Sequence, residues 1–297
     1  MIVVFGSLIA DLLFAVDKLP RAGETVVGRD YVVSGGGKGA NQALAASRDG
    51  ASVAMVGAVG RDGFADIVLA GLRRSGVDLS GVAMLDQPTG CAAVGVDRSG
   101  ANQIMVAAGA NSHAKAAQVS DALLDRASLL LVQMELDRAE TETLIARARA
   151  RGCRIMFNLA PALPIASAAL RAVDYLLVNE IEAAALAGQC GAADASPQAL
   201  AKALGPTVIG TYGAQGALAC ADDQIITVPA LAVNAIDTTG AGDAFAGVLA
   251  ATLDRGASLE AGLRRAAVAG SLSCTARGAQ AALPDRAAVD AALARLS

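Results

Sequence analysis

Several residue types that mark common protein classes are scarce in this sequence. Its 297 residues include no tryptophan, one histidine and five cysteines, and only 3% of them are aromatic. With His113 as the single imidazole, no His/Cys cluster suggests a zinc site. The G-x-S-x-G pattern of serine hydrolases is also absent, so we expect His113 to be a bystander.

Long runs of one charge are missing as well. The 24 Lys and Arg residues and 28 Asp and Glu residues give a net charge of −4, and no basic block stands out. This pattern argues against nucleic acid or an anionic membrane surface as the main partner. Hydrophobic residues make up 54% of the chain, which is typical of a compact globular protein. The length fits one large α/β domain covering 1–297.

The cysteines and the apolar stretches argue against an exported or membrane protein. The five cysteines are scattered and form no C-x-x-C pair, so we expect reduced thiols in a cytoplasmic protein without a secretory leader. The uncharged run at 203–221 has the length of a membrane span. It contains Pro206 and four glycines, which favour a strand with turns over a lipid-facing helix.

Apolar runs alternate with helical patterns along the chain. We expect buried strands at 2–6, 52–59, 129–134, 154–159, 175–179 and 207–212. The clearest helices are expected at 38–49, 63–75, 138–151, 180–187, 242–254 and 258–275. This alternation predicts a mostly parallel sheet covered by helices on both faces, with ligands at the carboxyl ends of the strands.

Two stretches, 10–33 and 82–106, break this rhythm. Both contain short β-like pieces and turns, and neither has a helix of its own. We expect them to form a small β-sheet that projects from the main domain and acts as a lid.

A glycine-rich stretch, SGGGKGANQALAAS, spans 34–47. Its glycines either make a tight strand-to-helix turn or let the backbone approach a ligand closely. The spacing fits neither a Walker A loop nor the dinucleotide fingerprint. Lys38 and Asn41 at this turn could form hydrogen bonds with hydroxyl groups.

A second glycine-rich stretch, DTTGAGDAFAGVLA, spans 237–250 and opens the helix expected at 242–254. Free N–H groups at a helix start attract anions, and this would suit the γ-phosphate of a nucleotide. Alternatively, Asp243 simply caps the helix. Oxygen-bearing residues crowd the same loop, and such loops often hold a cation or a phosphate.

Other polar residues follow the expected strands. Asn179 and Glu182 could hold Mg²⁺ mostly through water, or could belong to a solvated helix start. The stretch 211–216 could wrap a nucleotide or form a hairpin turn. Asp11 and Glu135 could bind sugar hydroxyls, or could be solvated.

These motifs together resemble the ribokinase branch of the PfkB carbohydrate kinase family. The resemblance runs nearly end to end and rests on PRAGET (20–25), GGKGANQALAA (36–46), NLAPA (158–162), NEIEA (179–183), DTTGAGDAF (237–245) and TARGAQ (275–280). It implies a three-layer αβα sandwich with a mostly parallel central sheet and a small β-sheet lid that also forms the contact of a homodimer.

The resemblance also implies roles for individual residues. Asp243 matches the catalytic base, and Gly240, Ala241 and Gly242 match the anion hole. The positions that match sugar contacts are Asp11, Gly37, Lys38, Asn41, Glu135 and Asp243. Those that match nucleotide contacts are Asn179, Thr211, Gly213, Gly216, Gly242 and Ala267. Glu182 lies near Mg²⁺, and the monovalent cation (K⁺) is held mostly by carbonyls of Asp237, Thr239, Ser273, Ala276 and Gly278.

We therefore expect an ATP-dependent kinase that phosphorylates the primary hydroxyl of a sugar, with D-ribose giving ribose 5-phosphate as the first candidate. Ile9 stands where the branch carries Asn, and Ala282 stands where a Ser assists the cation site. The apolar Ile9 favours a change of sugar, so another pentose, a ketose or a nucleoside remains an alternative acceptor. A non-catalytic sugar sensor and a dinucleotide-dependent oxidoreductase are the alternatives from other classes.

Overall fold

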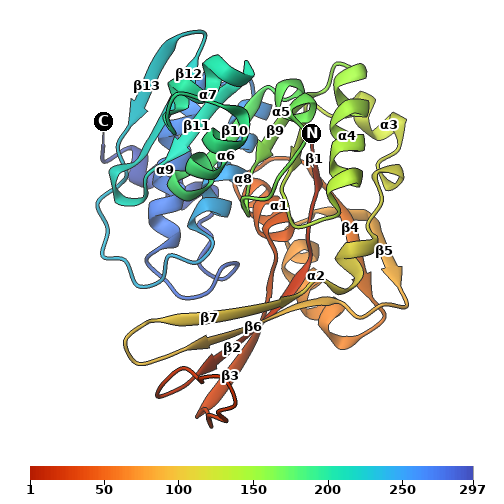
Figure 1. The fold of residues 1–297 in the computed structure, drawn as a ribbon, viewed down its shortest axis with the longest axis vertical. Coiled ribbons are helices and arrows are strands. Elements are labelled where there is room, and N and C mark those ends of the chain that lie inside the picture. Colours follow the sequence, from red (N-terminus) through yellow and green to blue (C-terminus); the bar gives the residue numbers. More distant parts are fainter. Residues whose placement is uncertain (297) are drawn as a thin grey trace.

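The computed structural model describes residues 1–296, and a nine-stranded sheet forms its centre (Figure 1). The strand order is β13-β12-β11-β10-β9-β8-β1-β4-β5. In chain order the strands are β1 (Ile2–Phe5), β4 (Val53–Gly60), β5 (Asp78–Leu85), β8 (Leu129–Val132), β9 (Arg154–Asn158), β10 (Tyr175–Asn179), β11 (Thr207–Thr211), β12 (Ala217–Ala221) and β13 (Gln224–Val228). Strands from β11 to β5 pair in parallel, whereas β12 and β13 pair antiparallel at one edge.

Helices cover both faces of this sheet. One face carries α1 (Lys38–Arg48), α2 (Gly63–Arg74), α8 (Ala241–Asp254) and α9 (Leu259–Ser273), with α10 (Arg286–Leu293) packed on α8 and α9. The other face carries α3 (Asp121–Arg126), α4 (Arg138–Ala150), α5 (Ser167–Ala172), α6 (Glu180–Cys190) and α7 (Pro197–Leu204).

Successive strand residues point into opposite cores, which explains why the strands are continuously apolar. In β1, Ile2 and Val4 join the core under α1 and α8, whereas Val3 and Phe5 join the core under α4. The predicted three-layer sandwich with a mostly parallel sheet is confirmed.

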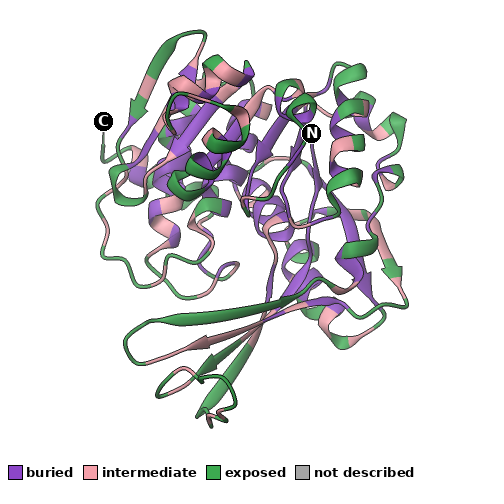
Figure 2. Ribbon diagram, in the orientation of Figure 1, coloured by how far each residue is buried: buried purple, intermediate pink, exposed green. Residues whose placement is uncertain are grey.

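A second sheet of four strands projects from the body of the molecule (Figure 1). Its order is β3 (Asp30–Gly36), β2 (Ile9–Ala15), β6 (Gly90–Val96) and β7 (Asn102–Ala107). Much of it is exposed, in contrast to the buried strands of the large sheet (Figure 2).

The predicted boundary of the lid is wrong at 82–85. These residues belong to β5 of the large sheet, where Val82 pairs with Gly57 and Leu85 pairs with Gly60 of β4. Val82 packs against one core and Leu85 against the other, so burial draws this edge strand into the body. The sequence pattern did not predict β5 as a strand of the large sheet, because DLSGVAML mixes polar and apolar residues.

The run at 203–221 contains the end of α7, β11, a short 3-10 turn and β12, in agreement with the predicted strand and turns. Among the residues that the structure describes, no helix has the length and hydropathy needed to cross a membrane.

The strand order has a topological switch point beside β1. From β1 the chain passes through the small sheet to β4 on one side, and after β5 it crosses to β8 on the other side. The loops that follow β1 and β8 therefore separate at the carboxyl edge of the sheet. In open α/β sheets, ligands bind at such a switch point.

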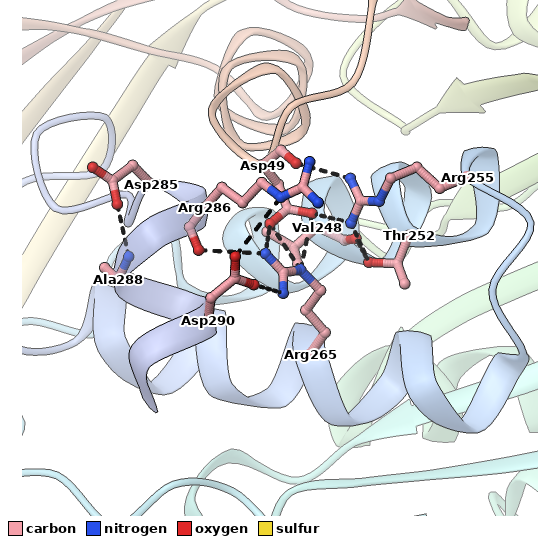
Figure 3. Close-up of polar contacts among 9 residues, drawn as sticks. All are labelled: Asp49, Val248, Thr252, Arg255, Arg265, Asp285, Arg286, Ala288 and Asp290. Carbon is pink, nitrogen blue, oxygen red and sulfur yellow. Dashed lines mark hydrogen bonds and ion pairs between the residues drawn. The ribbon is translucent and has the colours of Figure 1, made fainter. Parts of the chain in front are cut away.

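A cluster of charged side chains fastens the opposite end of α1 (Figure 3). Asp49, only 1% exposed, accepts hydrogen bonds from Nε of Arg265 on α9 (2.9 and 3.1 Å). Arg255, which follows α8, donates to the carbonyl oxygen of Asp49 at 2.8 Å. Arg265 also pairs with Asp290 of α10. The cluster thus ties α1 to α9, α10 and the end of α8.

Candidate active site

A cavity of about 240 Å³ lies at the carboxyl edge of the large sheet, beside the start of α8. It is bordered by the ends of β9, β10 and β11 and by the first residue of α1. The lining residues are Lys38, Asn158, Ala160, Leu177, Val178, Asn179, Glu182, Thr211, Thr238, Gly240, Gly242 and Asp243.

The turn that opens α8 requires a glycine. Gly240 has φ 78° and ψ 2°, and the N–H of Ala241 donates to the carbonyl of Thr238 at 3.2 Å. This geometry matches a type II turn, whose third residue needs a positive φ. Ala241 uses its N–H within the turn, whereas the N–H groups of Gly240, Gly242 and Asp243 have no hydrogen-bond partner among the described residues. Of the predicted anion hole, Gly240 and Gly242 therefore keep their N–H groups for a ligand.

The carboxylate of Asp243 is held by two amide side chains from α1. Asn41 donates through Nδ2 to Oδ2 of Asp243, and Gln42 donates through Nε2 to Oδ1, both at 2.9 Å. Asp243 is 7% exposed and still borders the cavity. Asp243 is not the cap of α8, whose N-cap is Gly240 without a side-chain hydrogen bond, and its carboxylate instead lies among polar groups from a second helix.

The predicted sugar residues gather where the small sheet joins the body. Oε2 of Glu135 accepts hydrogen bonds from the N–H of Lys38 (2.9 Å) and from the hydroxyl of Ser7. The carboxylate of Asp11 lies against Gly36, where a Cβ would come within 2.0 Å of its Oδ2. A side chain at position 36 would therefore displace the Asp11 carboxylate from its present place.

The charges of these groups affect one another. Burial raises the pKa of Asp11 to about 6, and the charges of Glu135 and Asp243 add to the shift. Burial lowers the pKa of the Lys38 ammonium, but the surrounding carboxylates outweigh it, so the net shift is upward. These carboxylates belong to Asp243, Glu135 and Glu182. The ammonium group of Lys38 thus lies among three carboxylates.

Asn179 and Glu182 form a reciprocal cap at the start of α6. Oδ1 of Asn179 accepts from the N–H of Glu182 (2.9 Å), and Oε2 of Glu182 accepts from the N–H of Asn179 (2.8 Å). Glu182 is 7% exposed, and burial raises its pKa despite the N–H of Asn179 and the charge of Lys38. It is a buried cap that borders the cavity, and not a solvated helix start.

The other predicted nucleotide residues lie in two places. Thr211 ends β11 at the cavity, and Gly213 and Gly216 form the turn of the β11–β12 hairpin. The stretch 211–216 thus forms a hairpin turn and also reaches the cavity, so its position is compatible with nucleotide binding as well. Ala267 lies on α9, is 5% exposed and packs in the hydrophobic core.

The structure brings the two predicted cation loops together. Asp237 accepts from the N–H of Thr239 and from the N–H of Gly278, both at 2.9 Å. The N–H groups of Ile236 and Asp237 donate to the carbonyl of Cys274, between Ser273 and Ala276. In the part of the chain that the structure describes, no group of three or more His, Cys, Asp or Glu residues is placed to hold a metal ion.

Four polar residues of this region were not predicted from the sequence: Ser7, Gln42, Gln133 and Asn158. Gln133 donates to Oε1 of Gln42 at 2.8 Å, and Gln42 donates to Oδ1 of Asn158 at 2.9 Å. The signals were present, since Gln42 follows Asn41 in GANQ and Asn158 ends an apolar strand in NLAPA. Each is a polar residue in an otherwise apolar, buried segment.

Comparisons with known proteins agree with this arrangement. The profile of the pfkB family carbohydrate kinases matches residues 1–286. The chain is 36% identical over 287 residues to the ribokinase of Bacillus subtilis and 32% identical over 291 residues to the deoxyribokinase of Salmonella typhimurium, with at least 95% of each chain covered. The structure of Arabidopsis thaliana ribokinase complexed with ribose and ATP superposes with a TM-score of 0.90 at 30% identity, covering 98% of both chains. This chain belongs to the pfkB family of carbohydrate kinases.

Proposed function

We propose that this enzyme transfers the γ-phosphoryl group of ATP to the primary hydroxyl of a pentose, with D-ribose giving ribose 5-phosphate. The observation that carries the proposal is the buried carboxylate of Asp243 beside the free N–H groups that begin α8. The family, the ribokinases among its relatives and the ribose and ATP complex of the Arabidopsis enzyme support it.

Each part of the site has a task in this reaction. Asp243 accepts the proton of the attacking hydroxyl. The N–H groups of Gly242 and Asp243, together with the helix dipole, stabilise negative charge on the transferred group. Asp11, Lys38 and Glu135 hold the sugar. The small sheet closes over the site and excludes water, which would otherwise hydrolyse ATP.

The donor groups fit the two expected cations. Glu182 uses one oxygen in its cap, and a single carboxylate suits Mg²⁺, which keeps several waters and binds the nucleotide phosphates. Both oxygens of Asp237 are engaged by backbone N–H groups, so this side chain braces the loop and leaves carbonyls for K⁺. Bound Mg²⁺ would offset phosphate charge during the transfer.

Ile9 favours 2-deoxyribose as a second acceptor. It is 5% exposed and pairs with Gly36 at the base of the small sheet, next to the strand residues that carry Asp11. An apolar side chain there offers no partner to a sugar hydroxyl, and a site without that partner accepts an analogue that lacks the hydroxyl. The deoxyribokinase relative is consistent with this alternative.

A comparison of acceptors tests the proposal. ADP release would be measured with ribose, 2-deoxyribose, fructose, inosine and cytidine, with and without K⁺. We expect the highest kcat/KM with one of the two pentoses. Higher values with a nucleoside would assign a nucleoside kinase, and tight sugar binding without ADP release would assign a sensor.

We also propose that two copies pair through their small sheets in the cytoplasm. Several large apolar side chains of this sheet are at least one-third exposed: Leu13, Phe14, Tyr31, Val32, Ile104, Met105 and Val106. The strand pairing places Leu13, Val32, Ile104 and Val106 on one face of this sheet and Phe14, Tyr31 and Met105 on the other. Pairing through one face would cover the set on that face, and light scattering should report a mass of two chains.

A further inference from the structure

The side chain of Gln42 has no task in the mechanism above, yet it contacts the proposed base directly. It lies in the first turns of α1, is 0% exposed and donates to Oδ1 of Asp243. A buried amide in an apolar helix must have its hydrogen-bonding groups satisfied, or the fold is destabilised. The partners of this amide therefore show what it does.

Every hydrogen-bonding group of the Gln42 amide is engaged. One Nε2 hydrogen serves Oδ1 of Asp243 and the other serves Oδ1 of Asn158, both at 2.9 Å, while Oε1 accepts from Nε2 of Gln133 at 2.8 Å. Gln133 and Asn158 are 1% and 7% exposed and lie at the carboxyl ends of β8 and β9. Rotating the amide would break all three bonds, so the sheet fixes its direction.

The two oxygens of Asp243 are not held equally firmly. Asn41 binds Oδ2, but its own Oδ1 is buried without a hydrogen-bond partner among the described residues. Asn41 is thus anchored by fewer bonds than Gln42, and it is one of the expected sugar contacts. Gln42 is the firmer of the two supports.

We propose that Gln42 is a positioning residue for phosphoryl transfer, which fixes Oδ1 of Asp243 and so orients the carboxylate toward the attacking hydroxyl. The inference rests on the proposed function, since it requires Asp243 to be the base. A carboxylate on a short side chain turns about χ1 and χ2, and a displacement of about 1 Å at a reacting group can cost about 100-fold in rate.

The test compares two equivalent substitutions in the same buried network. Gln42→Met keeps the volume and removes the donor to Asp243. Gln133→Met, the matched control, removes a hydrogen bond of the same network and leaves the donor to Asp243 in place. We expect Gln42→Met to lower kcat by about 10- to 100-fold with both KM values within about threefold of wild type, and Gln133→Met to lower kcat by less than about threefold.

The measurements separate positioning from stability. Thermal unfolding of both variants gives the folded fraction, and kcat is expressed per folded molecule. Equal kcat losses in the two variants, or a fall in total activity that the smaller folded fraction explains entirely, would show that Gln42 is only structural. If Gln42→Met does not fold, Gln42→Asn replaces it, because the shortened amide cannot reach Asp243 and the same fall in kcat is expected.

The experiment also distinguishes this inference from the proposed function. A wild-type protein that phosphorylates none of the acceptors overturns both. Wild-type turnover with a kcat within twofold in Gln42→Met leaves the kinase assignment standing and overturns the positioning role alone.

Discussion

At the scale of single residues, the carboxylate of Asp11 shows how burial tunes the site. Burial, and then the charges of Glu135 and Asp243, raise its pKa from 3.8 to about 6. Between about pH 4 and pH 6 the native protein keeps a proton that the unfolded chain has released. This group therefore lowers the free energy of unfolding as the pH rises through that interval. Keeping Asp11 ionised at neutral pH therefore lowers the stability of the fold.

This shift predicts a pH dependence of sugar binding. A protonated carboxyl accepts fewer hydrogen bonds, so the Kd for ribose should rise as the pH falls from 7.5 to 5. Calorimetry without nucleotide measures this directly. Asp11→Asn should bind more weakly at pH 7.5 and lose most of the pH dependence. An unchanged wild-type Kd across this range would contradict the assigned role of Asp11.

The residues that the sequence predicted were those with a recognisable pattern around them. Asp243 follows a glycine turn and Glu135 follows an apolar strand. The structure places Asp243 in the first turn of α8 and Glu135 just after β8, as those patterns predict. Gln42 and Gln133 were missed because a glutamine in a helix or after a strand is common and usually solvated. Only the meeting of α1, β8, β9 and α8 in space shows that these amides are buried together.

At the scale of elements, α1 joins two polar centres. Its first residues reach the cavity and Asp243, and Asp49 follows its last turn in the cluster of Figure 3. Eleven helical residues separate these ends by about 16 Å. The ion cluster therefore holds the helix without touching the site.

We predict that the ion cluster contributes to stability and not to turnover. Asp49→Ala leaves the guanidinium of Arg265, whose side chain is 10% exposed, without its buried partner, and should lower the free energy of unfolding by about 3–5 kcal/mol. Denaturant unfolding measures this change.

A matched control separates burial from charge alone. Asp86→Ala removes the exposed pair with Arg61 and should change the free energy of unfolding little. Equal effects of Asp49→Ala and Asp86→Ala would contradict the interpretation. So would a large fall in kcat per folded molecule for Asp49→Ala.

The elements that the sequence predicted were the strongly periodic ones. The six predicted strands and the six predicted helices all appear within three residues of their expected ends. β5 and β13 were misplaced or missed because these edge strands are partly exposed and mix polar with apolar residues. The short helices α3, α5, α7 and α10 are too brief to show a clear period.

At the scale of the whole molecule, the site is assembled from distant parts of the chain. Residues near 7–42, 133–182 and 237–243 meet at one edge of the large sheet, and the small sheet projects beside them (Figure 1). This convergence follows from the topological switch at β1. The resemblance anticipated it, whereas local patterns alone left each motif with two interpretations.

The central claim is that this assembly brings one carboxylate to a sugar hydroxyl while the start of α8 holds the γ-phosphate. The most direct test is transfer of labelled γ-phosphate to the preferred pentose by Asp243→Asn, with Kd values for sugar and ATP measured alongside. We predict that kcat falls by about 10²- to 10⁴-fold while both Kd values stay within about threefold of wild type. Turnover close to that of wild type in this variant would contradict the account.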